Sequence, residues 1–247
     1  MKNLLRLFAL ILALAVPALS TPAHAQELTP EEVKRLALEA ILENPEIVLE
    51  AVAIVREREE AAKQQAAEDA ITQLRDMLEN DPNAPVMGNP DGDVTVVEFF
   101  DYNCPYCKRS AAAIQELLEA DPNIRLVMRE WPILGEGSVF ASLASLAARE
   151  QGKYEEFHFA LMLADARKDE GVVRRIARDI GLDMDLIEAH MEDEAVTRHL
   201  QDSDGMARAL GFTGTPSFVI GGQAIYGFVP MEDMQAAVEA VRAEAAQ

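Results

Sequence analysis

The sequence predicts an α/β fold that carries a helical insertion and a helical N-terminal extension. Strand, helix and strand patterns alternate over residues 94–130, and two short strands with a final helix follow from residue 217. Between these parts the composition is continuously helical over residues 138–210. Residues 27–80 contain no glycine and no aromatic residue, and almost all of them are good helix formers. Alternating strands and helices are typical of a parallel sheet covered by helices.

The first 25 residues have the pattern of a secretory signal peptide. Lys2 and Arg6 precede an apolar run that reaches Leu19, and Ala23-His24-Ala25 supplies the small residues of a cleavage site. This apolar run is shorter than the roughly 20 residues that a membrane-spanning helix needs. We therefore expect cleavage and export to a compartment in which disulfides persist.

The chain is strongly acidic, with 43 Asp and Glu residues, 22 Lys and Arg residues and a formal net charge of −21. Removal of the predicted signal peptide takes away two positive charges and gives −23. Binding to nucleic acid needs clustered positive charge, so we expect no nucleic-acid partner. We interpret the acidity as that of a solvated surface.

The helical extension, predicted over residues 26–84, begins with a helix-start signal. Thr29 suits the N-cap, Pro30 suits the first helical position, and Glu32 completes a capping box. Asn44-Pro45 repeats the signal. We therefore expect one helix to end near Glu43 and another to begin at Pro45.

The second helix of the extension has only a thin apolar stripe. Val48, Val52 and Val55 follow spacings of four and three residues. Because it lacks aromatic residues, this stripe cannot build a core alone, and it packs either on the main domain or on copies of itself. Packing on copies would give a homo-oligomer, a dimer or a trimer. The charged segment 56–69 is either a solvated helix or a flexible connection.

The main domain is predicted over residues 85–247, after the helix-breaking segment 81–85. The strand predicted over 94–100 is apolar on both faces, which suits the centre of a sheet. A helix over 108–120 leads from it to a strand over 124–130. This order predicts a parallel pair of strands joined by a right-handed crossover.

The second half of the main domain contains the insertion, predicted over about 135–210. After it, strands over 217–220 and 224–226 flank Gly221-Gly222, which is the pattern of a β-hairpin. Pro230 opens a final helix that reaches about residue 245.

The only two cysteines of the chain lie in Cys104-Pro105-Tyr106-Cys107, between the predicted strand 94–100 and the predicted helix 108–120. The N-terminus of a helix favours a thiolate over a thiol, so Cys104 is the candidate nucleophile. Cys107 is placed to attack the mixed disulfide that forms on Cys104. The pattern favours thiol–disulfide exchange.

Other interpretations of the cysteine pair are weaker. A zinc site needs a second pair of ligands, and His158, His190 and His199 lack ligand spacing. A structural disulfide that closes so small a loop stabilises little. Haem attachment needs histidine where this chain has Lys108. We expect no cofactor. Alternatives of another class stay open, namely Cu(I) held by two thiolates and a surface interaction protein.

Glu98 is the sole ionisable residue of the predicted strand 94–100. Burial among apolar side chains raises the pKa of a carboxyl group. Since a strand that is apolar on both faces is not an edge strand, we expect Glu98 to be buried and functional.

In combination, these motifs resemble those of the thioredoxin superfamily, and in particular the DsbA-type thiol–disulfide oxidoreductases. That family carries a helical domain between its two β motifs. The resemblance covers about residues 85–247 and rests on Glu98-Phe99-Phe100, Cys104-Pro105-Tyr106-Cys107 and Thr215-Pro216. The N-terminal helices are similar to those of exported ScsC-like proteins.

The resemblance implies a role for each motif residue. Cys104 is the exposed attacking thiol, and Cys107 is more buried and has a higher pKa. Glu98 lies beneath the dithiol and exchanges a proton with Cys107. Thr215 and Pro216 bind substrate, with Pro216 preceded by a cis peptide bond.

The direction of exchange depends on the residues between the cysteines. Pro105 suits the first helical turn. DsbA has histidine where this chain has Tyr106, and tyrosine brings no positive charge to the thiolate. Tyr106 and Thr215 therefore favour a disulfide isomerase or reductase, and a DsbA-type oxidase is the alternative.

The resemblance also implies partners and a location. The clients are exported proteins that contain cysteine, in the periplasm of a Gram-negative bacterium. A membrane partner, either a DsbD-like reductant or a DsbB-like oxidant, would reset the dithiol.

Overall fold

The computed structural model describes residues 28–246, so the predicted signal peptide over 1–25 lies outside the described residues. The chain forms two compact units, of which the first ends at Ile54 and the second begins at Val55. Within residues 28–246, no helix has both the length and the apolar character needed to cross a membrane.

The first unit contains helix α1 (Pro30–Glu43) and the beginning of helix α2 (Glu46–Asn80). The predicted capping box is present, because the Thr29 hydroxyl accepts from the Glu32 amide and the Glu32 carboxylate accepts from the Thr29 amide. The break between the helices falls at Asn44 and Pro45, as predicted. Helix α1 buries none of its residues.

Helix α2 is continuous, so segment 56–69 is helical and the alternative of a flexible connection is wrong. Its second half buries Ala67, Ile71 and Leu78 in one cluster with residues of the sheet and of the insertion. For this reason the second unit begins at Val55, earlier than the predicted domain boundary after residue 84.

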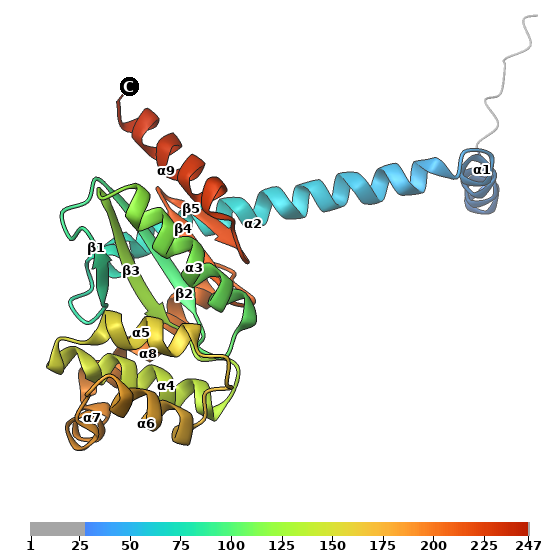
Figure 1. Ribbon diagram of the computed structural model, residues 1–247. Helices are drawn as coiled ribbons and strands as arrows, with labels where there is room; N and C mark the ends of the chain where they lie inside the picture. The colour runs from blue at the N-terminus through green and yellow to red at the C-terminus, as the bar shows by residue number, and fades with distance from the viewer. Residues whose placement is uncertain (1–27, 247) are drawn as a thin grey trace, which may run out of the picture. The chain divides into compact units, whose positions relative to one another are not determined.

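A five-stranded sheet forms the centre of the second unit, in the order β1-β3-β2-β4-β5 (Figure 1). The central strand β2 pairs in parallel with β3 and antiparallel with β4, so the predicted parallel pair and the central position are both confirmed. The short edge strand β1, which pairs antiparallel with β3, was not predicted. The strands are β1 (Val86–Gly88), β2 (Val94–Phe100), β3 (Ile124–Glu130), β4 (Ser217–Ile220) and β5 (Gln223–Tyr226).

Helices cover both faces of the sheet. On one face, α3 (Pro105–Ala120) and α9 (Met231–Ala245) pack on β2 and its neighbours through a large apolar cluster. On the other face lie α8 (Glu194–Ala209) and the second half of α2. This two-sided cover explains why β2 is apolar on both of its faces.

The predicted helical insertion is present between β3 and β4, and its helices α4 to α7 gather at one end of the sheet (Figure 1). The insertion also contains α8, which lies between α7 and β4 in the sequence. The insertion helices are α4 (Glu136–Ala147), a 3₁₀ turn η1 (Ala148–Gln151), α5 (Tyr154–Leu163), α6 (Glu170–Asp179) and α7 (Met184–Met191).

A buried polar network joins the end of α2 to the sheet and to the insertion. The Arg129 guanidinium donates to the Asp81 carboxylate at 2.7 Å. Next to it, the Glu130 carboxylate accepts from the Tyr154 hydroxyl at 2.6 Å and lies 2.6 Å from His199 Nε2. Arg129, Glu130 and His199 are completely buried, and buried polar groups of this kind need hydrogen-bond partners.

Candidate active site

The dithiol lies where the central strand gives way to helix α3. Strand β2 ends at Phe100, a short loop follows, and Cys104 is the N-cap residue of α3. The Cys104 amide donates to the Asp101 carbonyl at 3.1 Å, and Cys104 Sγ accepts from the Cys107 amide at 3.4 Å. Both cysteines are free thiols. This placement directs the unpaired amides of the helix N-terminus at one sulfur.

The two thiols differ strongly in acidity. The hydrogen bond with the Cys107 side chain, followed by those from Thr215 and from the amides of the first turn, lowers the pKa of Cys104 to about 6 against the opposing effect of burial. Burial raises the pKa of Cys107 far above its ordinary value, and the hydrogen bond to Cys104 and the charge of Glu98 add to this. Near neutral pH, Cys104 is therefore a thiolate and Cys107 is a thiol.

Cys104 is less exposed than the resemblance implied. Its exposed fraction is 6%, against 0% for Cys107. The loop before β4 covers it, since Cys104 Sγ lies 3.1 Å from the Thr215 carbonyl oxygen. The order of exposure agrees with the expectation, but both cysteines are buried.

Glu98 lies on β2, where it pairs with Met128 of β3 and Phe218 of β4. Only 2% of it is exposed, and burial is the main reason that its pKa rises from 4.5 to about 8. The nearby Ser110 side chain opposes the rise, and the charge of Cys104 adds to it. Glu98 Oε1 has no hydrogen-bond partner in the part of the chain that the structure describes. Glu98 is thus a buried carboxyl group able to exchange a proton near neutral pH.

The Thr215–Pro216 peptide bond is cis, as the resemblance implied. It lies directly before β4, and β4 pairs with β2 through Phe99 and Ser217. This pairing brings the Thr215 carbonyl to the dithiol although the two positions are 111 residues apart in the sequence.

The residues between and after the cysteines form the outer surface of the site. Pro105 is the first residue of α3, and Tyr106 is exposed. The Arg109 guanidinium lies 4.5 Å from the centre of the Phe228 ring and 5.8 Å from that of Tyr106. The Arg109 guanidinium therefore interacts with two aromatic rings of this surface.

Two polar residues of the loop before Cys104 were not predicted to be functional. The buried Asp101 carboxylate accepts from the Asn103 amide at 2.7 Å, from the Ser138 hydroxyl at 2.7 Å and from the Leu134 amide at 2.9 Å. The Asn103 side chain exchanges hydrogen bonds with the backbone of Lys168. Both residues therefore fix the dithiol loop to the insertion. The only signal in the sequence is their position between the strand and the cysteines.

Replacement of Asp101 by alanine is expected to lower the free energy of unfolding by about 3 kcal/mol, because one buried and two partly buried donors lose their acceptor. Urea denaturation of the reduced protein measures the change. Asp91→Ala is the control, since Asp91 is exposed and should shift stability by less than about 0.5 kcal/mol. Equal effects of the two substitutions would show that Asp101 does not hold the loop.

The histidines that the structure describes are not arranged as metal ligands. Within residues 28–246, no three His, Cys, Asp or Glu side chains gather as a metal site requires. His158 is buried with its Nδ1 3.1 Å from the Tyr102 hydroxyl, and burial lowers its pKa to about 4. It is therefore a neutral member of the core at physiological pH.

Comparison with known proteins places this geometry in a family. The model of the DSBA-like thioredoxin domain matches residues 95–239. A thioredoxin-like oxidoreductase from Silicibacter pomeroyi is 59% identical, with a TM-score of 0.67, over 68% of this chain and 97% of that one. The thiol-disulfide exchange protein alpha-DsbA2 from Wolbachia pipientis is 28% identical, with a TM-score of 0.67, over 73% and 98% of the two chains.

The likeness to ScsC reaches into the N-terminal helices. Proteus mirabilis ScsC in a compact conformation is 28% identical, with a TM-score of 0.66, over 88% of this chain and 100% of that one.

The chain spans about a quarter of the length of the first curated relatives that it matches, which are Na⁺/H⁺ antiporters of the NhaA type. Since the family model covers more than half of its residues, the chain belongs to the DsbA-like thioredoxin domain family, with the fold and the dithiol of a thiol–disulfide oxidoreductase.

Proposed function

We propose that this chain catalyses thiol–disulfide exchange on exported proteins through a mixed disulfide at Cys104. The observation that carries the proposal is the contrast between the two thiols at the start of α3. Cys104 has a pKa of about 6 and keeps an exposed fraction of 6%, whereas Cys107 is completely buried and its pKa is raised. Only Cys104 is a thiolate that can begin the reaction.

The exchange follows from these positions in two steps. The Cys104 thiolate attacks one sulfur of a client disulfide, which forms the mixed disulfide and releases the other client sulfur as a thiolate. Cys107 then loses its proton and attacks Cys104, which forms the Cys104–Cys107 disulfide and releases the reduced client. Glu98 is the proton acceptor that the site offers to Cys107. The charge of Cys104 raises the pKa of Glu98 and is lost when the mixed disulfide forms, which favours the Glu98 carboxylate at this step.

Activity with two client proteins tests the proposal. The reduced protein should accelerate the reduction of insulin by dithiothreitol and should recover activity from scrambled ribonuclease. If it does neither at a molar ratio at which a known oxidoreductase acts, the proposed function is wrong.

We propose further that the chain acts as a disulfide isomerase or reductase. A Cys104 pKa of about 6 lies between the roughly 7 of thioredoxin and the 3.5 of DsbA, and a less stabilised thiolate makes a weaker oxidant. In the periplasm, a DsbD-like membrane reductant would then keep the dithiol reduced.

The reduction potential is expected to lie near −200 mV or below, rather than near the −120 mV of DsbA. Equilibration of the protein with glutathione buffers, followed by alkylation of the remaining thiols and mass spectrometry, measures it. A value close to −120 mV would favour the alternative, a DsbA-type oxidase with a DsbB-like partner.

We also propose that the N-terminal helices assemble copies of the chain into a dimer or trimer. Helix α1 has no buried residue, and the beginning of α2 likewise exposes its apolar side chains. Several dithiols in one particle would raise the effective concentration of thiols around a bound client. The exposed apolar residues include Leu36, Leu38, Ile41, Leu42, Ile47, Val48, Leu49 and Val52.

The double substitution Leu42→Glu and Leu49→Glu is expected to reduce the particle mass to that of a monomer. These side chains are 70% and 73% exposed, so they add nothing to the folded monomer. Light scattering of the purified protein measures the mass. Leu163→Glu with Leu186→Glu is the matched control at two exposed positions of the insertion. A wild-type protein that is already monomeric would contradict the proposal.

A further inference from the structure

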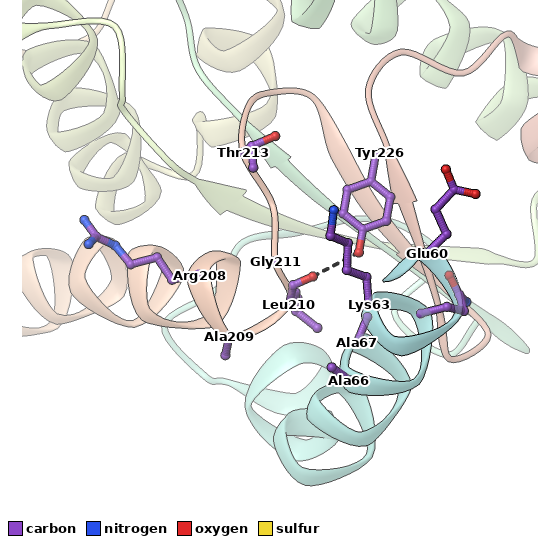
Figure 2. A pocket seen from close by; sticks show the side chains of 11 residues that line it. Glu60, Lys63, Ala66, Ala67, Arg208, Ala209, Leu210, Gly211, Thr213 and Tyr226 are labelled. Carbon is purple, nitrogen blue, oxygen red and sulfur yellow. Dashed lines mark hydrogen bonds between the residues drawn. The ribbon is translucent and has the colours of Figure 1, made fainter. Parts of the chain in front are cut away.

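A pocket of about 540 Å³ lies in the second unit, on the side of the sheet that carries α2 and α8. Its lining residues reach it from three segments, which are α2, the end of α8 with the following loop, and strand β5 (Figure 2). Its size is within the range of pockets that bind small molecules or side chains. The reaction described above does not use it.

The walls of the pocket are largely apolar. Ala66 and Ala67 of α2 face Leu210 and the ring of Tyr226 across it. The Tyr226 hydroxyl donates to the Leu210 carbonyl at 3.1 Å, so its one donor is already used (Figure 2). An apolar group that enters this pocket leaves water without stranding a buried polar atom.

The charged residues of the pocket lie on α2 and at the end of α8. Arg208 is paired with Asp204 at 3.0 Å. Lys63 makes no ion pair within the described residues, and Glu60 is one helical turn away from it. These side chains are exposed, so they form a polar rim around an apolar interior.

One lining residue connects the pocket to the dithiol. Thr213 is two residues before Thr215, whose carbonyl lies 3.1 Å from Cys104 Sγ. Two residues of chain span at most ~7 Å, so the pocket begins within one short segment of the reacting sulfur. A client whose sulfur reaches Cys104 therefore lies close to this segment.

The spacing of an extended client is within this limit. In an extended chain, side chains at positions i and i+2 point to the same side and are about 6.6 Å apart. When a client cysteine points at Cys104, the side chain two positions away is therefore offset by no more than the ~7 Å that two residues of chain can span, which is enough to reach from Thr215 to Thr213 at the edge of the pocket.

We propose that this pocket receives an apolar side chain of the client, two positions from the client's reacting cysteine. The proposal rests on the proposed function, since it identifies the substrate class of the same site. It makes the second half of α2 a part of the client-binding surface. The enzyme then prefers cysteines of buried apolar segments, which are the ones exposed in misfolded proteins.

Peptides test the preference directly. Each peptide carries one cysteine as a mixed disulfide with glutathione, and the peptides differ only in having leucine or serine two positions before or two positions after it. With the wild-type full chain, leucine in one of the two placements is expected to lower KM by about tenfold and to leave kcat unchanged. Equal KM values for leucine and serine in both placements would overturn the proposal.

A pocket-filling variant locates the effect. Ala66→Trp places a large ring in the pocket, and Ala61→Trp places the same ring at an exposed alanine of α2 that does not line it. Only Ala66→Trp should raise KM for the leucine peptide, and neither variant should change the rate with oxidised glutathione. Equal KM values of the two variants for the leucine peptide would show that the client side chain binds outside this pocket. Thermal unfolding checks that both variants are folded.

A binding measurement separates this proposal from the proposed function. A fluorescent leucine peptide with serine in place of its cysteine is added to the wild-type chain, and its anisotropy is recorded with and without Ala66→Trp. If wild type reduces oxidised glutathione but Ala66→Trp leaves peptide binding unchanged, the pocket proposal fails and the function stands. If the peptide binds in the pocket but no disulfide is exchanged, the proposed function fails. If N-acetyl-leucinamide binds as tightly as the peptide, the pocket is a small-molecule site and the client proposal is wrong.

Discussion

Replacement of Cys104 by serine is expected to reduce disulfide exchange to the background rate of the buffer thiols, whereas Cys107→Ser should trap clients as covalent complexes. Serine at position 104 leaves no thiolate at the start of α3, and Cys107 cannot take over because it is buried and its pKa is raised. Without Cys107, the mixed disulfide on Cys104 forms as before but has no internal thiol to resolve it.

Two measurements check this pair of variants. Insulin reduction gives the activity, and mass spectrometry of the non-reduced Cys107→Ser protein gives the trapped client. The rate of alkylation of Cys104 by iodoacetamide should rise with pH through a midpoint of about 6 in wild type, as expected from its pKa. Retention of insulin reduction in Cys104→Ser would place the chemistry at another group.

Replacement of Glu98 by glutamine is expected to have two opposite effects, on activity and on stability. Resolution of the mixed disulfide should slow by about a hundredfold, because glutamine cannot accept the Cys107 proton. The folded protein should at the same time gain stability relative to wild type as pH rises, since glutamine has no charge to bury.

The direction of the stability effect follows from the raised pKa of Glu98. Between pH 4.5 and about 8, the carboxyl is protonated in the folded state and ionised in the unfolded state. The unfolded state therefore binds fewer protons, and wild-type stability falls as pH rises through this window. At pH 7 the loss relative to pH 4 amounts to about 3 kcal/mol, and above pH 8 it no longer changes.

The stability effect is measured by urea denaturation of the reduced wild-type protein and of Glu98→Gln, from pH 4 to pH 9. The rate of the resolution step is measured by stopped-flow release of a fluorescent client. Glu119→Gln removes a carboxyl group from the exposed surface of α3 and serves as the control. A stability difference between wild type and Glu98→Gln that is flat with pH would show that Glu98 is ionised in the folded state.

The parts of the site that depend on local patterns were predictable from the sequence. Strand β2, the dithiol and α3 follow one another within 94–120, and they are encoded by an apolar run, by cysteine spacing and by helix composition respectively. The position of β2 at the centre of the sheet followed from its two apolar faces. The Glu98 prediction used the same reasoning, and its burial is confirmed.

The parts that depend on distant partners were not predictable. Asp101 and Asn103 act through Ser138 and Lys168, which lie 35 to 65 residues further along the chain. Strand β1 has three residues, too few for an alternation to show. The predicted extension ends at residue 84, whereas the second compact unit already begins at Val55. The apolar stripe of α2 did not reveal this difference, because its pattern is the same whether it packs on the sheet or on another copy of the chain.

The absence of any buried residue in α1 has a consequence for how this helix is stabilised. A helix of 14 residues is only marginally stable in water when nothing packs on it. Its helical state is therefore linked by mass action to whatever covers its apolar side chains. If that cover is a second copy of the chain, folding of residues 30–43 and association are one reaction. The amide protons of α1 would then become more protected from exchange as the protein concentration rises, while those of β2 would not change.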